Sequence, residues 1–512
     1  MTAPSRPTVA VVGGGIAGLA AAWELVAGTA AAGDGPRPEV IVLESDGRLG
    51  GKLRAESFAG RRVDLAADAF LARRPEATEL CDQLGLSEEL VPVGATGASV
   101  WARGRLRPMP DGLSLGVPTR WLPLVRTGIL SPSEALSVAR DLVLPHRGRG
   151  TTFGDRTVGE IVEERLGRPL VDRLADPLIG GIHAGDVDHL SAAATFPVLL
   201  AASQQPGSLM RRLGSARARA ERSGPGPGSP VFWSLAGSTA GLTDALAAAL
   251  AGRGVTLRTA TPVEAIERRG EGRRGRAGWT LALGPLSPAP GGSTGLEVDA
   301  VILAAPAPDA AVLLAPHAPV AAGVLSTVRY ASVAVVTLAL PEGSVRTPLR
   351  GTGFLVPRAS TVDGRPSLIT GCTYLGRKWP HLARPGDELI RASVGRFDDD
   401  RHTSLGDDEL VASVLGELAT LLDLRGHPLD ALVTRWERSF PQYEVGHLIR
   451  VDRIEKALAP LPGLDVAGAA LRGVGIPACI GSGRDAARRV LAFLGGRSAG
   501  DRGRAEDPAS GP

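Results

Sequence analysis

Short runs of consecutive apolar residues alternate along the chain with longer alanine- and leucine-rich stretches. The first run, Val9–Val12, favours a buried strand, and the alanine-rich stretch after it favours a helix. A second run, Val40–Leu43, predicts the next strand of the same sheet. Because a strand–helix–strand unit joins parallel strands, the N-terminal region is predicted to open a parallel sheet.

A glycine-rich turn joins the first strand to the first helix. Gly13, Gly15 and Gly18 have the spacing that allows a tight turn, a close approach of a pyrophosphate and close helix–strand packing. The N-terminus of the helix offers free N–H groups to that diphosphate. Glu44 follows the second strand, where a carboxylate can accept a ribose hydroxyl. The pattern predicts a dinucleotide site, and its alternative is a bare scaffold without a ligand.

The residues after Glu44 indicate which dinucleotide is bound. Arg48, Gly50, Gly51 and Lys52 follow at once, and the stretch resembles the E-x-x-x-R-x-G-G-[KR] continuation of FAD-binding oxidoreductases of the amine oxidase superfamily. The resemblance implies a second loop folded over the diphosphate of FAD. The alternative interpretation is a surface loop with two solvated cations.

The segment Val63–Phe70 reads V-D-x-A-A-D-x-F, and it resembles the superfamily segment whose backbone lies against the flavin ring. Small residues at Ala66 and Ala67 suit a close approach of a flat ring to the backbone. The alternative is that these alanines only fill the core.

The remaining patterns divide the chain into segments. Helical periodicity at Val158–Leu166 and Pro169–Ile179 predicts a mainly helical insert. A run of alternating apolar residues at Ala331–Leu340 and a helix at Asp407–Leu424 predict a mixed sheet-and-helix region, and a last helix is expected at Cys479–Phe493. The predicted segments are an FAD-binding domain in three pieces (1–97, 229–305 and 435–495), a helical insert (98–225), a substrate-binding domain (306–430) and a disordered tail (496–512).

The fold class expected from this division is α/β. It combines a discontinuous, Rossmann-like FAD-binding domain with a mixed α+β substrate domain and the helical insert. The apolar stretch Leu113–Leu130 in the insert predicts either an apolar surface, as in membrane-bound relatives, or a buried helical layer.

Composition and charge exclude several classes of protein. The formal net charge is only +3 over 512 residues and no basic cluster is interleaved with aromatic residues, which argues against a nucleic-acid partner. The eight histidines show no metal-ligand spacing, so no metal site is expected. No stretch approaches the ~20 apolar residues that span a bilayer, although this leaves peripheral membrane contact open.

Three scattered cysteines, Cys81, Cys372 and Cys479, argue for a reducing compartment and against disulfides. The N-terminal residues lack the apolar region of a secretory signal. A cytoplasmic location is therefore predicted.

Three longer motifs indicate which group of flavin-dependent oxidoreductases the chain resembles. The segment Asp176–Ser191 followed by Phe196-Pro197, the segment Arg435–His447 and the segment Gly468–Gly483 are similar to motifs of bacterial flavin-dependent coproporphyrinogen III and protoporphyrinogen oxidases. The resemblance covers nearly all of residues 8–494. Ala469 and Ala478 depart from the Asn and Asp that are frequent in the family, which puts particular polar contacts in doubt but not flavin binding.

The resemblance implies a set of FAD contacts. Val263 would hold the adenine through its backbone, and Trp436 would pack near the ring unless it is an ordinary core tryptophan. The implied cofactor-binding residues are Gly13, Gly14, Gly15, Ile16, Ala17, Gly18, Glu44, Ser45, Arg48, Gly51, Lys52, Leu65, Ala66, Ala67, Asp68, Val263, Trp436, Val474, Gly475 and Ile476. A cysteine at position 479 raises the alternative of covalent flavin attachment. Its place at a helix start after Pro477 instead favours a packed thiol.

The reaction implied by the family is the oxidation of a porphyrinogen to a porphyrin. It needs three two-electron rounds, each with hydride transfer to flavin N5, proton loss to solvent and reoxidation of the flavin by O2 to H2O2. Because aromatisation drives the reaction, no catalytic side chain is expected. The substrate walls are assigned to Leu178, Ile179, Gly181, Ala305 and Ala307.

The arginines Arg103, Arg105 and Arg107 stand on alternate positions and are candidates for binding substrate propionates. The alternative is a solvated edge strand. The arginine-rich chain favours coproporphyrinogen III, with four propionates, over protoporphyrinogen IX, with two. A flavin amine oxidase and a desaturase-like flavoprotein are the competing functions.

Overall fold

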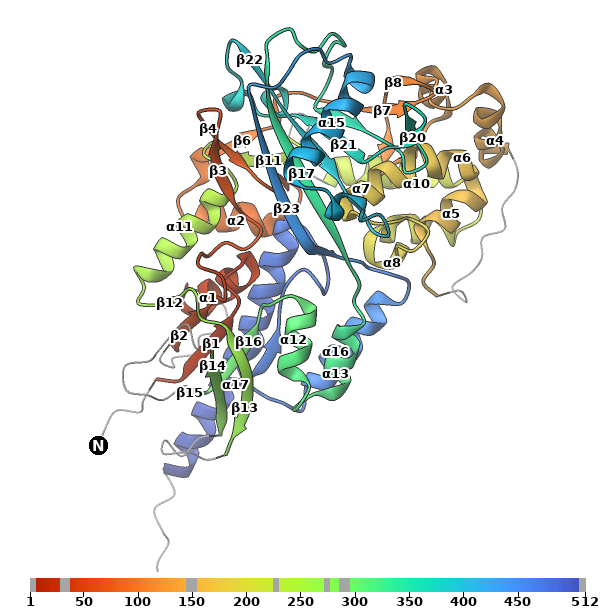
Figure 1. Ribbon diagram of the computed structural model, residues 1–512. Helices are drawn as coiled ribbons and strands as arrows, with labels where there is room; N and C mark the ends of the chain where they lie inside the picture. Colours follow the sequence, from red (N-terminus) through yellow and green to blue (C-terminus); the bar gives the residue numbers. More distant parts are fainter. Residues whose placement is uncertain are drawn as a thin grey trace, which may run out of the picture.

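The computed structural model describes residues 6–27, 37–143, 154–223, 230–270, 277–284 and 295–505. In Figure 1 the nucleotide-binding layers fill the lower half of the view, a large sheet fills the upper half, and the helical insert lies at the upper right. The Gly/Pro-rich stretch at 224–229 and the last residues, 506–512, fall outside the described residues.

A five-stranded parallel sheet forms the centre of the lower half. Its order is β12-β2-β1-β16-β24, and every neighbouring pair is parallel. The strands are β1 (Thr8–Val12), β2 (Glu39–Leu43), β12 (Thr256–Arg258), β16 (Ala300–Leu303) and β24 (Leu464–Val466). These strands come from three distant parts of the chain, as the predicted discontinuous domain requires.

Alternate side chains of β1 enter two different cores, because successive residues of a strand point to opposite faces. Val9 and Val11 pack with helices α1, α11 and α17, whereas Ala10 and Val12 pack with α12, α13 and α16. The helices are α1 (Ile16–Ala27), α11 (Ala240–Ala251), α12 (Ala307–Leu314), α13 (Pro319–Ser326), α16 (His447–Leu458) and α17 (Ile476–Ala505). The parallel sheet with both faces covered confirms the α/β class.

A seven-stranded sheet in the order β23-β17-β22-β21-β18-β7-β8 forms the upper half. Helix α15 (Asp407–Leu422) packs its apolar face against it. The strands are β7 (Ser99–Ala102), β8 (Arg105–Pro108), β17 (Tyr330–Pro341), β18 (Gly353–Leu355), β21 (Ile369–Tyr374), β22 (Asp387–Val394) and β23 (Asp430–Pro441).

Three of the predicted boundaries differ from the structure. Strands β7 and β8, expected in the helical insert, complete the large sheet, because β7 pairs in parallel with β18. Strand β23 crosses the boundary near residue 435, and the helices at 307–326 pack on the nucleotide-binding sheet rather than on the substrate side. These three boundaries depend on which remote segments pair or pack together. Local sequence patterns do not show that.

The helical insert has its own apolar core, which buries Leu124, Ile129 and Leu130. The buried-layer interpretation therefore holds for these three residues, whereas Leu122 is 52% exposed, and the apolar-surface interpretation stays a prediction for the rest of 113–130. Helix α5 has the predicted bounds and begins with a capping box between Thr157 and Glu160. The helices are α3 (Trp121–Thr127), α4 (Pro132–Val143), α5 (Val158–Leu166), α6 (Arg168–Leu170), the π-helix η2 (Val171–Gly180), α7 (Gly181–His183), α8 (Ala192–Thr195), α9 (Pro197–Ser203) and α10 (Leu209–Ser223).

The remaining elements are short and connect these layers. The strands are β3 (Ala55–Phe58), β4 (Arg61–Asp64), β5 (Phe70–Leu71), β6 (Leu90–Pro92), β9 (Leu113–Ser114), β10 (Val117–Pro118), β11 (Phe232–Leu235), β13 (Val263–Arg269), β14 (Gly278–Leu283), β15 (Gly295–Val298), β19 (Thr361–Val362) and β20 (Arg365–Pro366). The helices are α2 (Pro75–Gln83), α14 (Leu375–Lys378) and the 3-10 turns η1 (Ser87–Glu89), η3 (Pro380–Leu382) and η4 (Arg401–Ser404).

Helix α17 is longer than predicted at both ends. It starts at Ile476 and its backbone continues to Ala505, into the segment from 496 for which a disordered tail stays a prediction. The helix lies so close to α1 that a Cβ at Gly483 would be 2.0 Å from the carbonyl oxygen of Ala17. The part of α17 that packs on α1 acts as a helix nucleus. Adding further residues to an existing helix costs little free energy.

Candidate active site

The three glycines of the first turn occupy three different environments. Gly13 has a φ of +111°, and a Cβ there would be 2.7 Å from the Ala304 carbonyl oxygen. A Cβ at Gly18 would lie 1.9 Å from the carbonyl oxygen of Gly13, whereas a Cβ at Gly15 would meet nothing within 4 Å. Gly13 and Gly18 are therefore required by the fold, and only Gly15 leaves open space for a ligand.

The second glycine loop lies directly on the first, and its predicted contact with a diphosphate stays a prediction. The Gly50 N–H donates to Gly14 O at 2.9 Å, and a Cβ at Gly51 would be 3.1 Å from the Cα of Gly15. The Arg48 guanidinium donates to Gly51 O at 2.6 Å, so this cation stabilises its own loop.

Glu44 stands at the carboxyl end of β2 and joins two parts of the site. Its carboxylate accepts the N–H of Gly14 at 2.6 Å and the N–H of Asp46 at 2.8 Å, and the Ser45 hydroxyl lies 3.2 Å away. The Glu44 carbonyl accepts the Thr261 N–H at 2.8 Å, which brings the start of β13, Val263, to the same edge of the sheet. The predicted ribose and adenine residues are therefore neighbours.

Lys52 reaches from the second glycine loop to the C-terminal part of the chain. Its ammonium group donates to Ser439 O on β23 and lies near the Cys479 thiol. Burial lowers the pKa of Lys52, and burial raises the pKa of Cys479 to about 11 against the effect of Lys52. The Cys479 side chain is thus a protonated, packed thiol at the start of α17.

The segment Leu65–Asp68 is anchored from behind by a buried charge network. The Asp68 carboxylate accepts hydrogen bonds from Lys378 at 2.7 Å, Arg391 at 2.9 Å and Trp379 at 3.2 Å. Burial alone would raise the pKa of Asp68, but Lys378 and Arg391 outweigh it and hold that pKa well below its usual range.

Sequence reasoning missed Lys378, Trp379 and Arg391, although one signal existed. Lys378 is one of only three lysines among 57 basic residues, beside Lys52 and Lys456. In front of this network, Ala66 is partly exposed and Ala67 is exposed. The backbone of Leu65–Asp68 is therefore held rigidly while its small side chains remain accessible.

The C-terminal loop before α17 is held by an aromatic pair. The Tyr443 hydroxyl donates to Ala469 O and accepts the Gly473 N–H at 2.8 Å, and its ring stacks on His447 at a centroid distance of 3.9 Å. His447 Nε2 lies 2.6 Å from Leu471 O. These contacts position Val474–Ile476 and the positive end of the α17 dipole at the site.

The predicted substrate walls do not all lie on one surface. Gly181 is exposed, and a Cβ there would be 3.9 Å from the Leu355 side chain, while Leu178 is partly exposed and Ile179 is 2% exposed. Ala305 borders the glycine turn instead, because its N atom would be 3.2 Å from a Cβ at Gly13. Ala307 is packed in the core below the sheet, and its N–H donates to the Tyr330 hydroxyl at 3.0 Å.

The three arginines of the β7–β8 hairpin differ in environment. Arg103 and Arg105 are exposed at its tip, and β8 is the edge strand of the large sheet. Arg107 is buried and donates to Ala102 O at 3.0 Å and Thr127 O at 3.4 Å. Arg107 therefore serves packing, and the binding of propionates by Arg103 and Arg105 stays a prediction.

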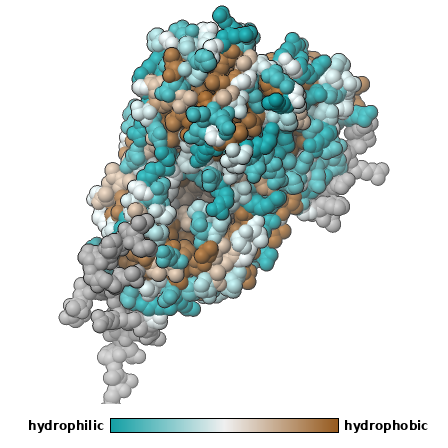
Figure 2. Space-filling view, in the orientation of Figure 1, coloured by the Kyte–Doolittle hydropathy of each residue, from teal (hydrophilic) through white to brown (hydrophobic). Residues whose placement is uncertain are grey.

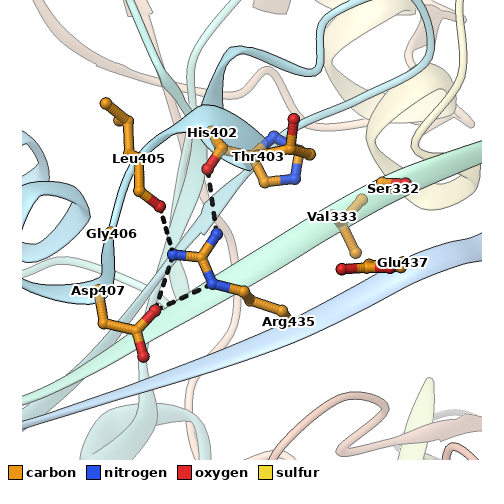
Figure 3. A pocket seen from close by; sticks show the side chains of 9 residues that line it. All are labelled: Ser332, Val333, His402, Thr403, Leu405, Gly406, Asp407, Arg435 and Glu437. Atoms are coloured by element: carbon orange, nitrogen blue, oxygen red, sulfur yellow. Dashed lines mark hydrogen bonds and ion pairs between the residues drawn. The ribbon is translucent and has the colours of Figure 1, made fainter.

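Figure 2 shows the surface hollowed near the middle of this face, between the lower and upper halves of the molecule. A separate small cavity of about 260 Å³ is lined by His402, Asp407, Arg435 and their neighbours (Figure 3). Arg435 precedes Trp436 in β23, so the two side chains leave the strand on opposite faces. The small cavity thus lies on the other face of the sheet from the Trp436 side chain.

The described part of the chain shows neither a membrane-spanning helix nor a cluster of metal ligands. No helix there combines the length and apolar composition needed to cross a membrane. Across the same residues, no three histidine, cysteine, aspartate or glutamate side chains gather as metal ligands would.

Comparison with known families matches residues 16–491 to the family described as flavin containing amine oxidoreductase. The chain belongs to this family. Membership in a flavin-containing family confirms the prediction of FAD as the cofactor.

Relatives within the family are similar over nearly their whole length. The coproporphyrinogen III oxidase of Bacillus subtilis (strain 168) is 36% identical over 95% of this chain and 98% of its own. The enzyme of that name from Staphylococcus aureus is 31% identical over 95% and 99%, and the protoporphyrinogen oxidase of Bos taurus is 32% identical over 94% and 98%.

Two solved structures show the same fold. The crystal structure of a "Putative protoporphyrinogen oxidase" from Exiguobacterium sp. 255-15 has a TM-score of 0.80 and 31% identity, covering 95% of this chain and 99% of that one. Cyclohexylamine oxidase from Brevibacterium oxydans IH-35A has a TM-score of 0.62 at 16% identity over 96% and 100%. The second likeness bears on the fold alone.

Proposed function

We propose that this protein oxidises coproporphyrinogen III to coproporphyrin III, with FAD as the hydride acceptor and O2 as the final electron acceptor. The observation that carries the proposal is the full-length similarity to enzymes named coproporphyrinogen III oxidase, at 31–36% identity in the first three relatives. The three motifs around Asp176, Trp436 and Gly475 lie within this similarity.

The geometry supports a particular placement of FAD. Gly15 and Gly51 would contact the diphosphate, since only open space lies over Gly15 and the two loops touch there. Glu44 would accept a ribose hydroxyl, because a carboxylate that already accepts two N–H groups still has free lone pairs. Leu65–Asp68 and Val474–Ile476 would border the isoalloxazine ring together with Trp436.

Bound FAD would supply the hydride acceptor in three two-electron rounds, each of which removes two hydrogens from the macrocycle and reduces one O2 to H2O2. The chain's own residues would bind and orient the macrocycle and exclude water. Leu178 and Gly181, the accessible members of the predicted wall, suit an apolar ring. No side chain is asked to act as a strong base, because the porphyrin product is aromatic.

A second substrate, protoporphyrinogen IX, is favoured by the names of the Bos taurus and Exiguobacterium relatives. We place coproporphyrinogen III first because its four carboxylates suit the exposed Arg103 and Arg105. We also propose a cytoplasmic location, which the three free, buried cysteines support.

The test is anaerobic mixing of the purified yellow protein with coproporphyrinogen III, protoporphyrinogen IX or putrescine. We expect coproporphyrinogen to bleach the flavin absorbance fastest, and admission of air to give porphyrin fluorescence and H2O2. A higher kcat/KM for protoporphyrinogen would overturn the substrate assignment. Bleaching by putrescine alone would favour an amine oxidase, and a protein that leaves all three unchanged would refute the proposal.

A further inference from the structure

A buried carboxylate sits inside the π-helix that carries the predicted substrate wall. Asp176 is 8% exposed and precedes Pro177 and Leu178 in η2. A Cβ at Gly180 would be 2.9 Å from Asp176 Oδ1, and the Val187 N–H lies 3.5 Å from the same oxygen. Single π-helical turns cost hydrogen-bond geometry and occur frequently at functional sites.

An arginine from the large sheet's side approaches this carboxylate. Arg358 Nε lies 4.0 Å from Asp176 and 3.7 Å from Asp186, while its Nη atoms donate to Phe397 O and Gly185 O, each at 3.1 Å. The Leu355 side chain, three residues earlier, would lie 3.9 Å from a Cβ at Gly181. The segment 355–358 therefore holds the end of the π-helix from two sides.

We propose that Asp176 and Arg358 are positioning residues that hold Leu178–Ile182, the segment where the π-helix ends and α7 begins, in place as a wall of the substrate slot. This inference rests on the proposed function only for the identity of the substrate. Neither residue touches the reacting atoms. The pair fixes where the apolar wall stands relative to the sheet.

Electrostatics supports a role beyond stability. Burial raises the pKa of Asp176 to about 6, with Arg358 opposing, Asp186 reinforcing and Arg396 opposing the rise. A carboxyl pKa raised on folding contributes stability below the unfolded value of 3.8, and this stability is lost as the pH rises through about 6. At pH 7 the ionised carboxylate therefore costs stability, which is typical of a group retained for function.

The test compares Asp176→Asn with Asp172→Asn, a matched control on the same helix whose partner Arg168 is on the surface. For Asp176→Asn at pH 7 we expect a Tm equal to or above that of the parent protein, a KM for coproporphyrinogen raised about tenfold and a nearly unchanged kcat. Asp172→Asn should change none of these. A KM within about twofold of the parent protein would overturn the proposal.

A second readout separates this inference from the proposed function. Amide hydrogen exchange without substrate should be faster over residues 178–187 in Asp176→Asn than in Asp172→Asn, and equal rates would overturn the positioning role whatever the substrate is. If Asp176→Asn does not fold, Arg358→Lys undergoes the same comparison, because lysine keeps the charge and loses the fork of donors. If exchange differs between the two variants as expected but the parent protein does not oxidise coproporphyrinogen, only the proposed function is refuted.

Discussion

The indole Nε1 of Trp436 donates a hydrogen bond to Leu65 O at 3.0 Å, across 371 residues of sequence. The bond joins β23 of the large sheet to the segment whose small side chains are exposed at the site. This bond therefore fixes β23 and the segment around Leu65 relative to each other at the place where the flavin ring is expected. Trp436 thus holds Leu65 through its N–H, in addition to the contact with the flavin ring that we propose.

Replacement of Trp436 by phenylalanine keeps an aromatic ring and removes this bond. We expect a loss of about 1 kcal/mol in FAD affinity, since Leu65 O loses its donor beside the ring. Fluorescence titration of the apoprotein with FAD measures the change. Trp279→Phe, in the core below the sheet, should lower stability without changing FAD affinity, and equal effects of both variants on affinity would contradict the assignment.

The glycine turn predicts opposite outcomes for two similar substitutions. Gly18→Ala should lower the free energy of unfolding by about 3 kcal/mol, because its Cβ would overlap the Gly13 carbonyl. Gly15→Ala should change stability by less than about 1 kcal/mol, yet weaken FAD binding about tenfold or more. Denaturant unfolding of the apoproteins and FAD titration check both effects. Normal FAD binding by Gly15→Ala would contradict the placement of the diphosphate.

Removal of the Asp68 charge tests the buried network. Asp68→Asn leaves Lys378 and Arg391 without their common carboxylate, and we expect a loss of about 3 kcal/mol in the free energy of unfolding. The control is Asp244→Asn, which breaks an exposed ion pair with Arg62 and should cost less than about 1 kcal/mol. Similar losses in the two variants would show that the network is not a rigid support.

His447 predicts part of the pH dependence of stability. Burial lowers its pKa to about 4 from the usual 6.5. A pKa depressed on folding contributes stability above 6.5, and this is lost as the pH falls from 6.5 toward 4, by about 3 kcal/mol in total. Urea unfolding at pH 7 and pH 5 should show a smaller difference for His447→Gln than for the parent protein. The exposed His427, replaced by glutamine, serves as the control.

The two interpretations of the β7–β8 hairpin lead to different kinetics. If Arg103 and Arg105 bind propionates, alanine at both positions should raise KM for coproporphyrinogen about tenfold and KM for protoporphyrinogen less. If the hairpin is only a solvated edge, neither KM changes, because both side chains are exposed. Steady-state assays with both substrates decide between these outcomes.

The sequence by itself determined the elements whose cause is local. Apolar runs predicted strands at Val9–Val12 and Val40–Leu43, which the structure extends by one residue to Thr8 and Glu39. Glycine spacing predicted the first turn, and helical periodicity predicted α5 to the residue. These features depend on backbone conformation and on burial of one face. Both can be inferred from residues that are close together in the sequence.

Only the tertiary structure decided which remote segments meet. Three examples are the pairing of β7 with β18, the contacts of Asp68 and the approach of Arg358 to Asp176. In each, the two residues are between 182 and 323 positions apart in the sequence. The spacing of residues along the chain carries no record of which faces pack together. Buried charges in particular acquire their partners, and therefore their pKa values, only when the layers close on one another.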